Sequence, residues 1–348
     1  MTKKTLELIN LTTWPGQLEY FRSCPGGLAG FLEEFQLDGV ELIQAGGPPE
    51  AAAGLRPYIR GWHLPFWPDW LDFYRQNTKR LRKSFPDRES LIYYYGSDDP
   101  KELCLCWRRE LAAAERLGAR YAVIHVANCT GEEAFSYSFA AGDQEVAEGF
   151  IQLLNETLAG LEAEGFQGNI KILLENLWWP GLTLRNPEIV RKLLEEIHYE
   201  RLGLVLDISH LMNTNLSLRS QREAAAYVHQ VLDGLGPLAG RIQAVHLNSA
   251  LSGAYVAETK ALFQQGPALP APRDMAEFQE CFRQVSRHIG RIDPHQPFCD
   301  PAIREVLERI RPEFLVHELV HSDPGQARRA LAAQLRPLRS RRPDWDGN

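Results

Sequence analysis

The chain has 348 residues, a formal net charge of −7 and a pI near 5.9, so its charge gives no reason to expect nucleic acid or an anionic membrane as a partner. Its apolar fraction of 44% is ordinary for a globular protein with a large core. The opening residues, MTKKTLELIN, lack the apolar stretch of a signal peptide, and no apolar run is long enough to cross a bilayer. Six cysteines without a CxxC pair indicate reduced thiols and predict a cytoplasmic location.

Eight short apolar runs, each a candidate strand, alternate with segments of helical periodicity. The runs cover residues 6–11, 39–43, 58–63, 121–125, 170–175, 203–207, 242–247 and 314–318. The helical segments cover residues 27–35, 51–56, 101–118, 145–165, 187–197, 222–235 and 325–335. This alternation predicts an α/β fold, a single (β/α)8 TIM barrel over residues 1–335. We expect residues 249–290 to form an insertion between strands seven and eight, as a lid or an oligomer contact, and residues 336–348 to form a frayed basic tail.

Most of the predicted strands end on a histidine or a carboxylate. These residues are His63, His125, Glu175, Asp207 followed by His210, His246, and Glu318, with Asp293 and His295 between the last two strands. The carboxyl ends of the strands of a barrel meet at one face, which is where such proteins keep their chemistry. Nitrogen and oxygen ligands suit zinc, manganese or iron, and converging carboxylates would repel one another unless cations were bound. The sequence therefore predicts one to three divalent metal ions.

The remaining histidines carry no such prediction. His198, His229 and His288 lie on or just after helices and are interpreted as surface residues. His317 alternates with Glu318 in the last strand, so we expect it to point out of the barrel.

Aromatic and amide side chains follow the strand ends and are candidates for substrate binding. Trp62, Trp67 and Trp178 could stack on a sugar face or a planar ring, or could instead pack the loops against one another. Asn176 and Asn248 supply uncharged polar groups that suit hydroxyls more than phosphates. We expect a small-molecule substrate, and the sequence leaves open a homo-oligomer.

Short motifs at the strand ends resemble those of the xylose-isomerase-like TIM-barrel superfamily. They are WHLP at 62–65, IHVAN at 124–128, LLEN at 173–176, LDISH at 206–210, VHLN at 245–248, Asp293-x-His295, and Glu318. The superfamily includes sugar epimerases and the endonuclease IV type of AP endonuclease. Similarity to the AP endonucleases implies that all nine candidate ligands hold a three-metal cluster. Similarity to the single-metal epimerases implies one ion, held by Glu175, Asp207, His246 and Glu318.

Three functions follow from these alternatives. The favoured one is a metal-dependent isomerase or epimerase of a small sugar or related polyhydroxy carbonyl compound, in which Glu175 and Glu318 move a proton and His210 contacts the substrate. The second is phosphoester hydrolysis by two or three metal ions, with His210 as a ligand. The third is oxidation by a multinuclear iron centre on the same ligands. The uncharged polar groups expected around the carboxyl end of the barrel favour the first function. His63, His125 and the Asp293-x-His295 pair favour the other two. Hydride-shifting xylose isomerases carry a lysine two places after the glutamate that corresponds to Glu175. Leu177 stands at that position here, which argues against a hydride shift.

Overall fold

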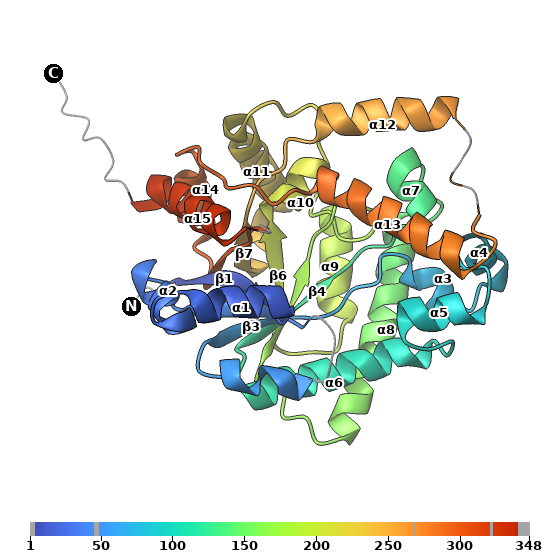
Figure 1. Ribbon diagram of the computed structural model, residues 1–348, viewed down its shortest axis with the longest axis horizontal. Coiled ribbons are helices and arrows are strands. Elements are labelled where there is room, and N and C mark those ends of the chain that lie inside the picture. Colours follow the sequence, from blue (N-terminus) through green and yellow to red (C-terminus); the bar gives the residue numbers. More distant parts are fainter. Residues whose placement is uncertain (1–3, 45–48, 267–268, 270, 321–322, 340–348) are drawn as a thin grey trace.

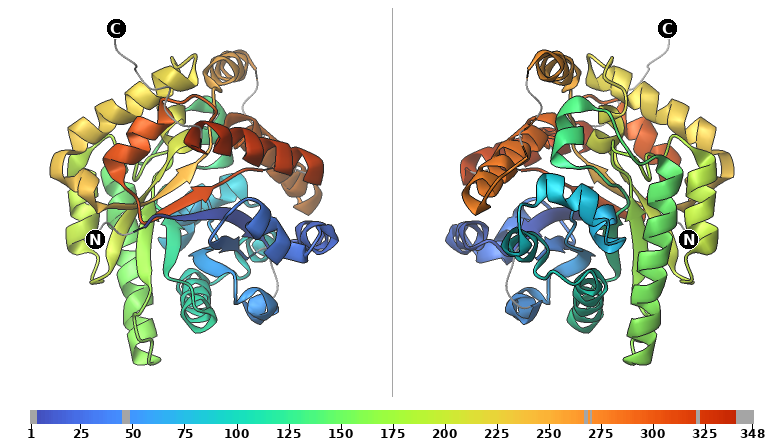
Figure 2. Two further views of the ribbon diagram at one scale, coloured as in Figure 1. Left: turned by 90° about the vertical axis from the view of Figure 1, so that its left-hand side faces the viewer. Right: turned by 90° about the vertical axis from the view of Figure 1, so that its right-hand side faces the viewer.

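The computed structural model describes residues 4–44, 49–266, 269, 271–320 and 323–339, and in this part of the chain eight parallel strands close into one barrel (Figures 1 and 2). The strands follow one another around the barrel in chain order, and β1 pairs with both β2 and β8. Their bounds are β1 Leu6–Thr12, β2 Gly39–Ile43, β3 Ile59–His63, β4 Tyr121–His125, β5 Lys171–Glu175, β6 Leu202–Asp207, β7 Ile242–Leu247 and β8 Phe314–His317. The predicted (β/α)8 barrel is confirmed.

Helices surround the barrel and also extend the loops at its carboxyl end (Figure 2). Those between the strands β1 and β4 are α1 Pro15–Ser23, α2 Gly27–Glu34, α3 Trp70–Tyr74, α4 Thr78–Ser84, α5 Arg88–Tyr95 and α6 Lys101–Leu117. Those from β4 to β7 are α7 Gly131–Ser136, α8 Asp143–Ala163, α9 Pro187–Glu196, α10 Ile208–Asn213 and α11 Gln221–Leu235. The last four are α12 Gly253–Gln265, α13 Met275–Ile292, α14 Ile303–Ile310 and α15 Pro324–Arg339, and 3-10 turns cover Pro49–Leu55 (η1) and Gly236–Arg241 (η2). Residues 51–56, predicted as a helix, belong largely to η1.

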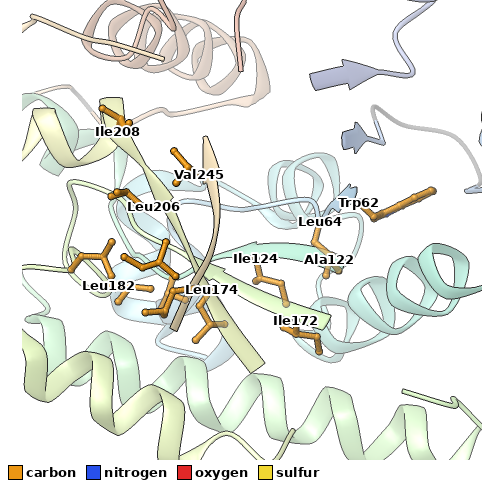
Figure 3. Packing of buried hydrophobic residues seen from close by; sticks show 14 of the residues in the cluster. Trp62, Leu64, Ala122, Ile124, Ile172, Leu174, Leu182, Leu206, Ile208 and Val245 are labelled. Atoms are coloured by element: carbon orange, nitrogen blue, oxygen red, sulfur yellow. The ribbon is translucent and has the colours of Figure 1, made fainter. Parts of the chain in front are cut away.

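Alternation along each strand separates two hydrophobic layers. On β5, Ile172 and Leu174 face outward into the large cluster between barrel and helices, part of which Figure 3 shows. Leu173, between them, points into the barrel and packs with Val123 and Val205. Because side chains alternate with a period of two, Glu175 has the same inward orientation as Leu173, one layer closer to the mouth. The interior of the barrel is thus apolar toward the amino ends of the strands and polar at their carboxyl ends.

The segment between β7 and β8 contains two helices, α12 and α13, which lie at the carboxyl end of the barrel (Figure 1). Both contact α7, and α13 also contacts α5. At the end of the chain, α15 continues to Arg339, so residues 336–339 are helical and the expected frayed tail is wrong for them. Residues 340–348 lie outside the described part. Among the described helices, none has the length and apolar character needed to cross a membrane.

Candidate metal centre

The nine predicted ligands come together inside the carboxyl end of the barrel. Their ligand atoms form three groups, and within each group those atoms lie within 4.8 Å of one another. The groups are His63, His125 and Glu175; Glu175, Asp207, His246 and Glu318; and Asp207, His210 and His295. Asp293, the ninth residue, lies against the third group. The sequence therefore identified residues that the fold does bring together.

The first group joins the ends of β3, β4 and β5. The Nε2 atoms of His63 and His125 each lie 3.1 Å from Oε2 of Glu175. The pairing of His125 with Glu175 in the parallel register of β4 and β5 accounts for the second contact. The Glu175 carboxylate is fully buried, whereas 15% of the His125 side chain is exposed. His125 therefore marks one place where solvent reaches the centre.

The second group surrounds His246 on β7. Its Nδ1 atom lies 3.1 Å from Oε1 of Glu175, 3.1 Å from Oε2 of Glu318 and 3.9 Å from Oδ2 of Asp207. Asp207 and His246 are Cα partners in the β6–β7 register, which places them side by side. The three carboxylates consequently face one imidazole nitrogen from different strands.

The third group depends on the loop before α14. His210 Nε2 lies 3.0 Å from Oδ2 of Asp293, and His295 Nε2 lies 3.5 Å from the same oxygen. His295 has a φ of 45°, a left-handed conformation that is uncommon for a residue with a side chain. Backbone hydrogen bonds of 2.7 and 3.1 Å between Ser249 and Gln296 hold this loop to the end of β7. This anchor explains how residues beyond the α12–α13 segment reach the site.

Two carboxylates are shared between groups. Glu175 belongs to the first and second groups, through one oxygen in each case, and Asp207 belongs to the second and third. Carboxylates that reach two ligand sets are suited to bridging neighbouring ions. The three groups therefore form one continuous centre.

Burial and charge strongly shift the pKa values of these residues. Burial raises the pKa of Asp207 to about 7, and the nearby carboxylates of Glu318 and Glu175 add to this effect. Burial acts in the same direction on Glu175, but His125 and His246 overcome it and hold the pKa of that carboxyl well below its usual range. For His295, burial is outweighed by Asp293 and Glu318, which raise its pKa to about 10. The carboxylates of the centre therefore favour positive charge beside them, from an imidazolium or from a metal ion.

The donor set fits divalent metal ions. The four ligand carboxylates and five imidazoles offer oxygen and nitrogen atoms, and no thiolate belongs to the groups found among the described residues. Such ligands suit zinc, manganese and iron. A cation beside Asp207 would also oppose the burial and the neighbouring carboxylates that together raise its pKa, because it favours the ionised carboxylate.

Glu41 is a functional candidate that the sequence reasoning missed. It is fully buried, its carboxylate accepts a 2.7 Å hydrogen bond from the Tyr121 hydroxyl, and it lies 3.2 Å from Nε2 of His246. An N–H at Nε2 would donate a hydrogen bond to Glu41 and would leave the lone pair of Nδ1 free to bind a metal ion. Gly61 makes room for this arrangement, since a Cβ there would lie 2.4 Å from Cζ of Tyr121. The signal in the sequence was a single charge at an inward position of the apolar strand GVELI.

The two predicted substrate-binding asparagines are buried and contact the ligand residues. The Asn248 amide donates to Oδ2 of Asp207 at 2.8 Å and to Oε2 of Glu318 at 3.3 Å. Asn176 exchanges hydrogen bonds of 3.0 and 2.9 Å with the backbone of Asp207. The hydroxyl of Ser209, which was not predicted, lies 3.0 Å from Oδ1 of Asp207 and 2.6 Å from Oδ1 of Asp293, and its single proton can be donated to either. These residues orient ligand carboxylates, and the contact of the two asparagines with substrate stays a prediction.

The three predicted tryptophans lie in different places. Trp62 is fully buried outside the barrel, where its Nε1 donates to Glu110 at 2.8 Å, so its predicted substrate contact is wrong (Figure 3). The reason is alternation, since His63 beside it points inward. Trp67 donates to the Tyr94 carbonyl and lies away from the ligands, in the wall of a neighbouring cavity. Trp178 lies at the centre, with its ring 5.3 Å from that of His210.

Two histidines outside the centre, His317 and His288, were also given predicted positions. His317 points out of the barrel as predicted, where Gln334 on α15 contacts its Nδ1 at 2.9 Å. His288 is buried, contrary to the predicted surface position. Its ring stacks on Phe135 at 3.9 Å and contacts Tyr255 and the Ala134 carbonyl. The helix α13 carries many charged residues, so the packing of His288 against α7 could not be recognised from the sequence.

Comparisons with known proteins place the chain in a family. Residues 38–300 match the family model of the xylose isomerase-like TIM barrel, a range that contains every candidate ligand except Glu318. Solved structures with a similar fold include a D-tagatose 3-epimerase-like protein, at 16% identity and a TM-score of 0.49, covering 95% of this chain and 97% of that one. Endonuclease IV from Thermus thermophilus matches at 16% identity and a TM-score of 0.44, covering 96% of this chain and 98% of that one.

A third similar structure is an AP endonuclease, family 2, from Brucella melitensis, at 14% identity and a TM-score of 0.48, covering 97% of this chain and all of that one. No curated protein matches. These low identities establish the shared fold alone, while the family model covers most of the chain. The chain belongs to the xylose isomerase-like TIM barrel family.

Proposed function

We propose that this chain is a multinuclear metal-dependent enzyme, and that hydrolysis of a small phosphoester is the function its geometry supports best. The observation that carries the proposal is the sharing of carboxylates: Glu175 and Asp207 each belong to two of the three ligand groups. A one-metal isomerase requires only the group around His246. It leaves unexplained why His63, His125 and His295 converge on the same carboxylates.

The reaction needs an electrophilic centre, a nucleophile and a means of keeping both in place. Ions held by the three groups would supply Lewis acidity toward phosphoryl oxygens and would lower the pKa of water to a value useful near neutrality. In the balanced reaction, the oxygen of water bonds to phosphorus, the ester P–O bond breaks, and the leaving alcohol takes the proton that water gives up. Asn248 and Ser209 hold the Asp207 carboxylate, and Trp178 limits the access of water to His210.

We propose a small substrate in preference to duplex DNA. The chain has a net charge of −7, which opposes binding of a polyanion that metal ions do not neutralise. The most exposed of the nine ligands are His125 and His295, whose side chains are 15% and 17% exposed, while the Glu318 side chain is 9% exposed. This limited exposure suits a single phosphoryl group better than a duplex.

An isomerase or epimerase of a small sugar or related polyhydroxy carbonyl compound is the second candidate. One observation favours it: Glu175 and Glu318 both approach Nδ1 of His246 at 3.1 Å, within one four-residue group. Two glutamates around a single ion can pass a proton on and off the carbon between them.

Two assays on protein purified without added metal separate these candidates. We expect release of 4-nitrophenol from 4-nitrophenyl phosphate or its diester, abolished by a chelator and restored by the metal that the protein carried. We expect no exchange of substrate carbon protons with D2O when ketoses are followed by NMR. Proton exchange without ester cleavage would overturn the hydrolase proposal in favour of the epimerase.

A further inference from the structure

A large cavity lies beside the metal centre and contains none of its nine ligands. Its volume is about 700 Å3, within the range of small-molecule sites. We call it the aromatic cavity, and its walls include Phe66, Trp67, Tyr94, Trp179, Phe278 and Phe282. The walls come from the loop after β3, from the helices α3, α4, α5, α7 and α13, and from the loop after β5.

The aromatic cavity adjoins the open side of the centre. The ring of Phe66 lies 4.8 Å from that of His125, the partly exposed ligand of the first group. Trp179 lies 4.7 Å from Trp178, whose ring reaches His210. A molecule that bound at the exposed edge of His125 would therefore extend past Phe66 into the cavity. The flat faces of the walls suit a planar group, because aromatic rings gain most from stacked or edge-to-face contact.

The charged groups of the walls define the charge of the occupant. Among the described lining residues, four carboxylates face two cations. Arg80 is paired with Asp72 at 3.2 Å, and Lys83 lies on the exposed rim. Asp69 accepts a hydrogen bond from the Tyr95 hydroxyl, while Glu133 is buried and accepts the backbone N–H groups of Thr130 and Ala140. A second anionic group would meet net repulsion here.

We propose that the aromatic cavity binds a planar organic group that is uncharged or cationic, held beside the metal centre. The identity of this group as the alcohol or phenol part of the ester rests on the proposed function. The binding itself does not, since it depends on the walls of the cavity alone. The substrate class is then an aryl or similarly flat phosphoester with no anionic group remote from the phosphoryl end.

Two probes of matched shape and opposite charge test the cavity in the protein as purified. Trimethyl(1-naphthyl)ammonium carries no atom that can ligate a metal ion, and 1-naphthalenesulfonate is its anionic counterpart. Isothermal titration calorimetry should show saturable binding of the ammonium and at least about tenfold weaker binding of the sulfonate. No binding of the ammonium would overturn the assignment, and tighter binding of the sulfonate would overturn the charge preference.

A pair of substitutions on one helix locates the binding. Cys281 and Gln284 both lie on α13, but Cys281 lines the aromatic cavity and the exposed Gln284 does not. Cys281→Trp should fill the space and weaken ammonium binding by at least about tenfold, while Gln284→Trp should change it by less than about twofold. Equal weakening by both would overturn the location. Should Cys281→Trp fail to fold, Phe282→Ala removes part of one wall and should weaken binding severalfold.

Hydrolysis assays keep this inference separate from the proposed function. If both hold, kcat/KM for 1-naphthyl phosphate exceeds that for methyl phosphate, and the difference shrinks in Cys281→Trp. Binding of the ammonium without hydrolysis of either ester supports the cavity and removes the hydrolase. Hydrolysis of both esters without ammonium binding overturns the cavity and keeps the hydrolase.

Discussion

The metal centre and the aromatic cavity lie side by side, but the chain builds them in different ways. The centre consists mainly of side chains at the ends of strands, where the barrel fixes their positions by register. The cavity consists of loop residues and of parts of α3, α4, α5, α7 and α13, and α13 packs against both α5 and α7. The barrel thus fixes the positions of the candidate ligands, while the added helices shape the cavity beside them.

This difference also explains what the sequence could predict. Strand ends with a single histidine or carboxylate after an apolar run, such as LDISH, were recognisable because the barrel imposes one orientation on them. The helices α3, α4 and α5 were not predicted, because they are short and their packing comes from distant residues. His288 was placed on the surface for the same reason, since its partners lie on α7 and α12.

Glu41 and Trp62 show what the sequence reasoning could not predict within the barrel itself. Both lie on predicted strands, and alternation decides their environment: Glu41 faces the interior and Trp62 faces the helices. A search restricted to strand ends overlooks the first and favours the second. Assigning inward and outward positions along each strand would have corrected both.

The largest expected effect comes from the shared carboxylate of the metal centre. Glu175→Gln keeps the shape of the side chain but loses the charge that two ligand groups share. We expect phosphoesterase activity to fall by more than about 100-fold, with a matching loss of bound metal. Replacing a residue that only contacts a metal ligand lowers activity by about 10–100-fold, so the loss expected here is larger. The exposed Glu188→Gln on α9 serves as the control. Unchanged metal content in Glu175→Gln would remove this residue from the ligand set.

A smaller effect is expected one layer below the ligands. Glu41→Gln should weaken metal binding by about 10–100-fold, because the imidazole of His246 loses an anionic hydrogen-bond acceptor. Competition with a chelator measures this affinity without reference to activity. Tyr121→Phe, which removes only the hydroxyl bound to Glu41, should lower the affinity less. The reverse order would show that Glu41 does not act through His246.

In the wall of the aromatic cavity, Asp69 should make stability depend on pH. Burial raises the pKa of this carboxyl to about 6, above its ordinary value of 3.8. The native state therefore favours the protonated form, and the associated stability is complete below the ordinary value and lost as the pH rises through about 6. The melting temperature of Asp69→Asn relative to the unsubstituted protein should thus increase from about pH 4.5 to about pH 7.5. A constant difference would contradict the shift.

The smallest expected effect on stability comes from the rim of the aromatic cavity. Phe282 is 40% exposed and meets Tyr94 edge-on, with ring centroids 5.7 Å apart. Phe282→Ala should lower the free energy of unfolding by about 1 kcal/mol or less while weakening the ammonium probe severalfold. Urea denaturation measures the free energy of unfolding. A large loss of stability with unchanged probe binding would show that this ring serves only to attach α13.

The most direct test of the account is the metal content of the full chain purified without added metal. Inductively coupled plasma mass spectrometry should find about three divalent ions per chain, because three ligand groups share two carboxylates. Zinc or manganese would agree with hydrolysis, whereas two or three irons with visible absorption would point to oxidative chemistry. One tightly bound ion per chain, unchanged when His63 and His295 are replaced by alanine, would contradict the multinuclear centre and favour the epimerase.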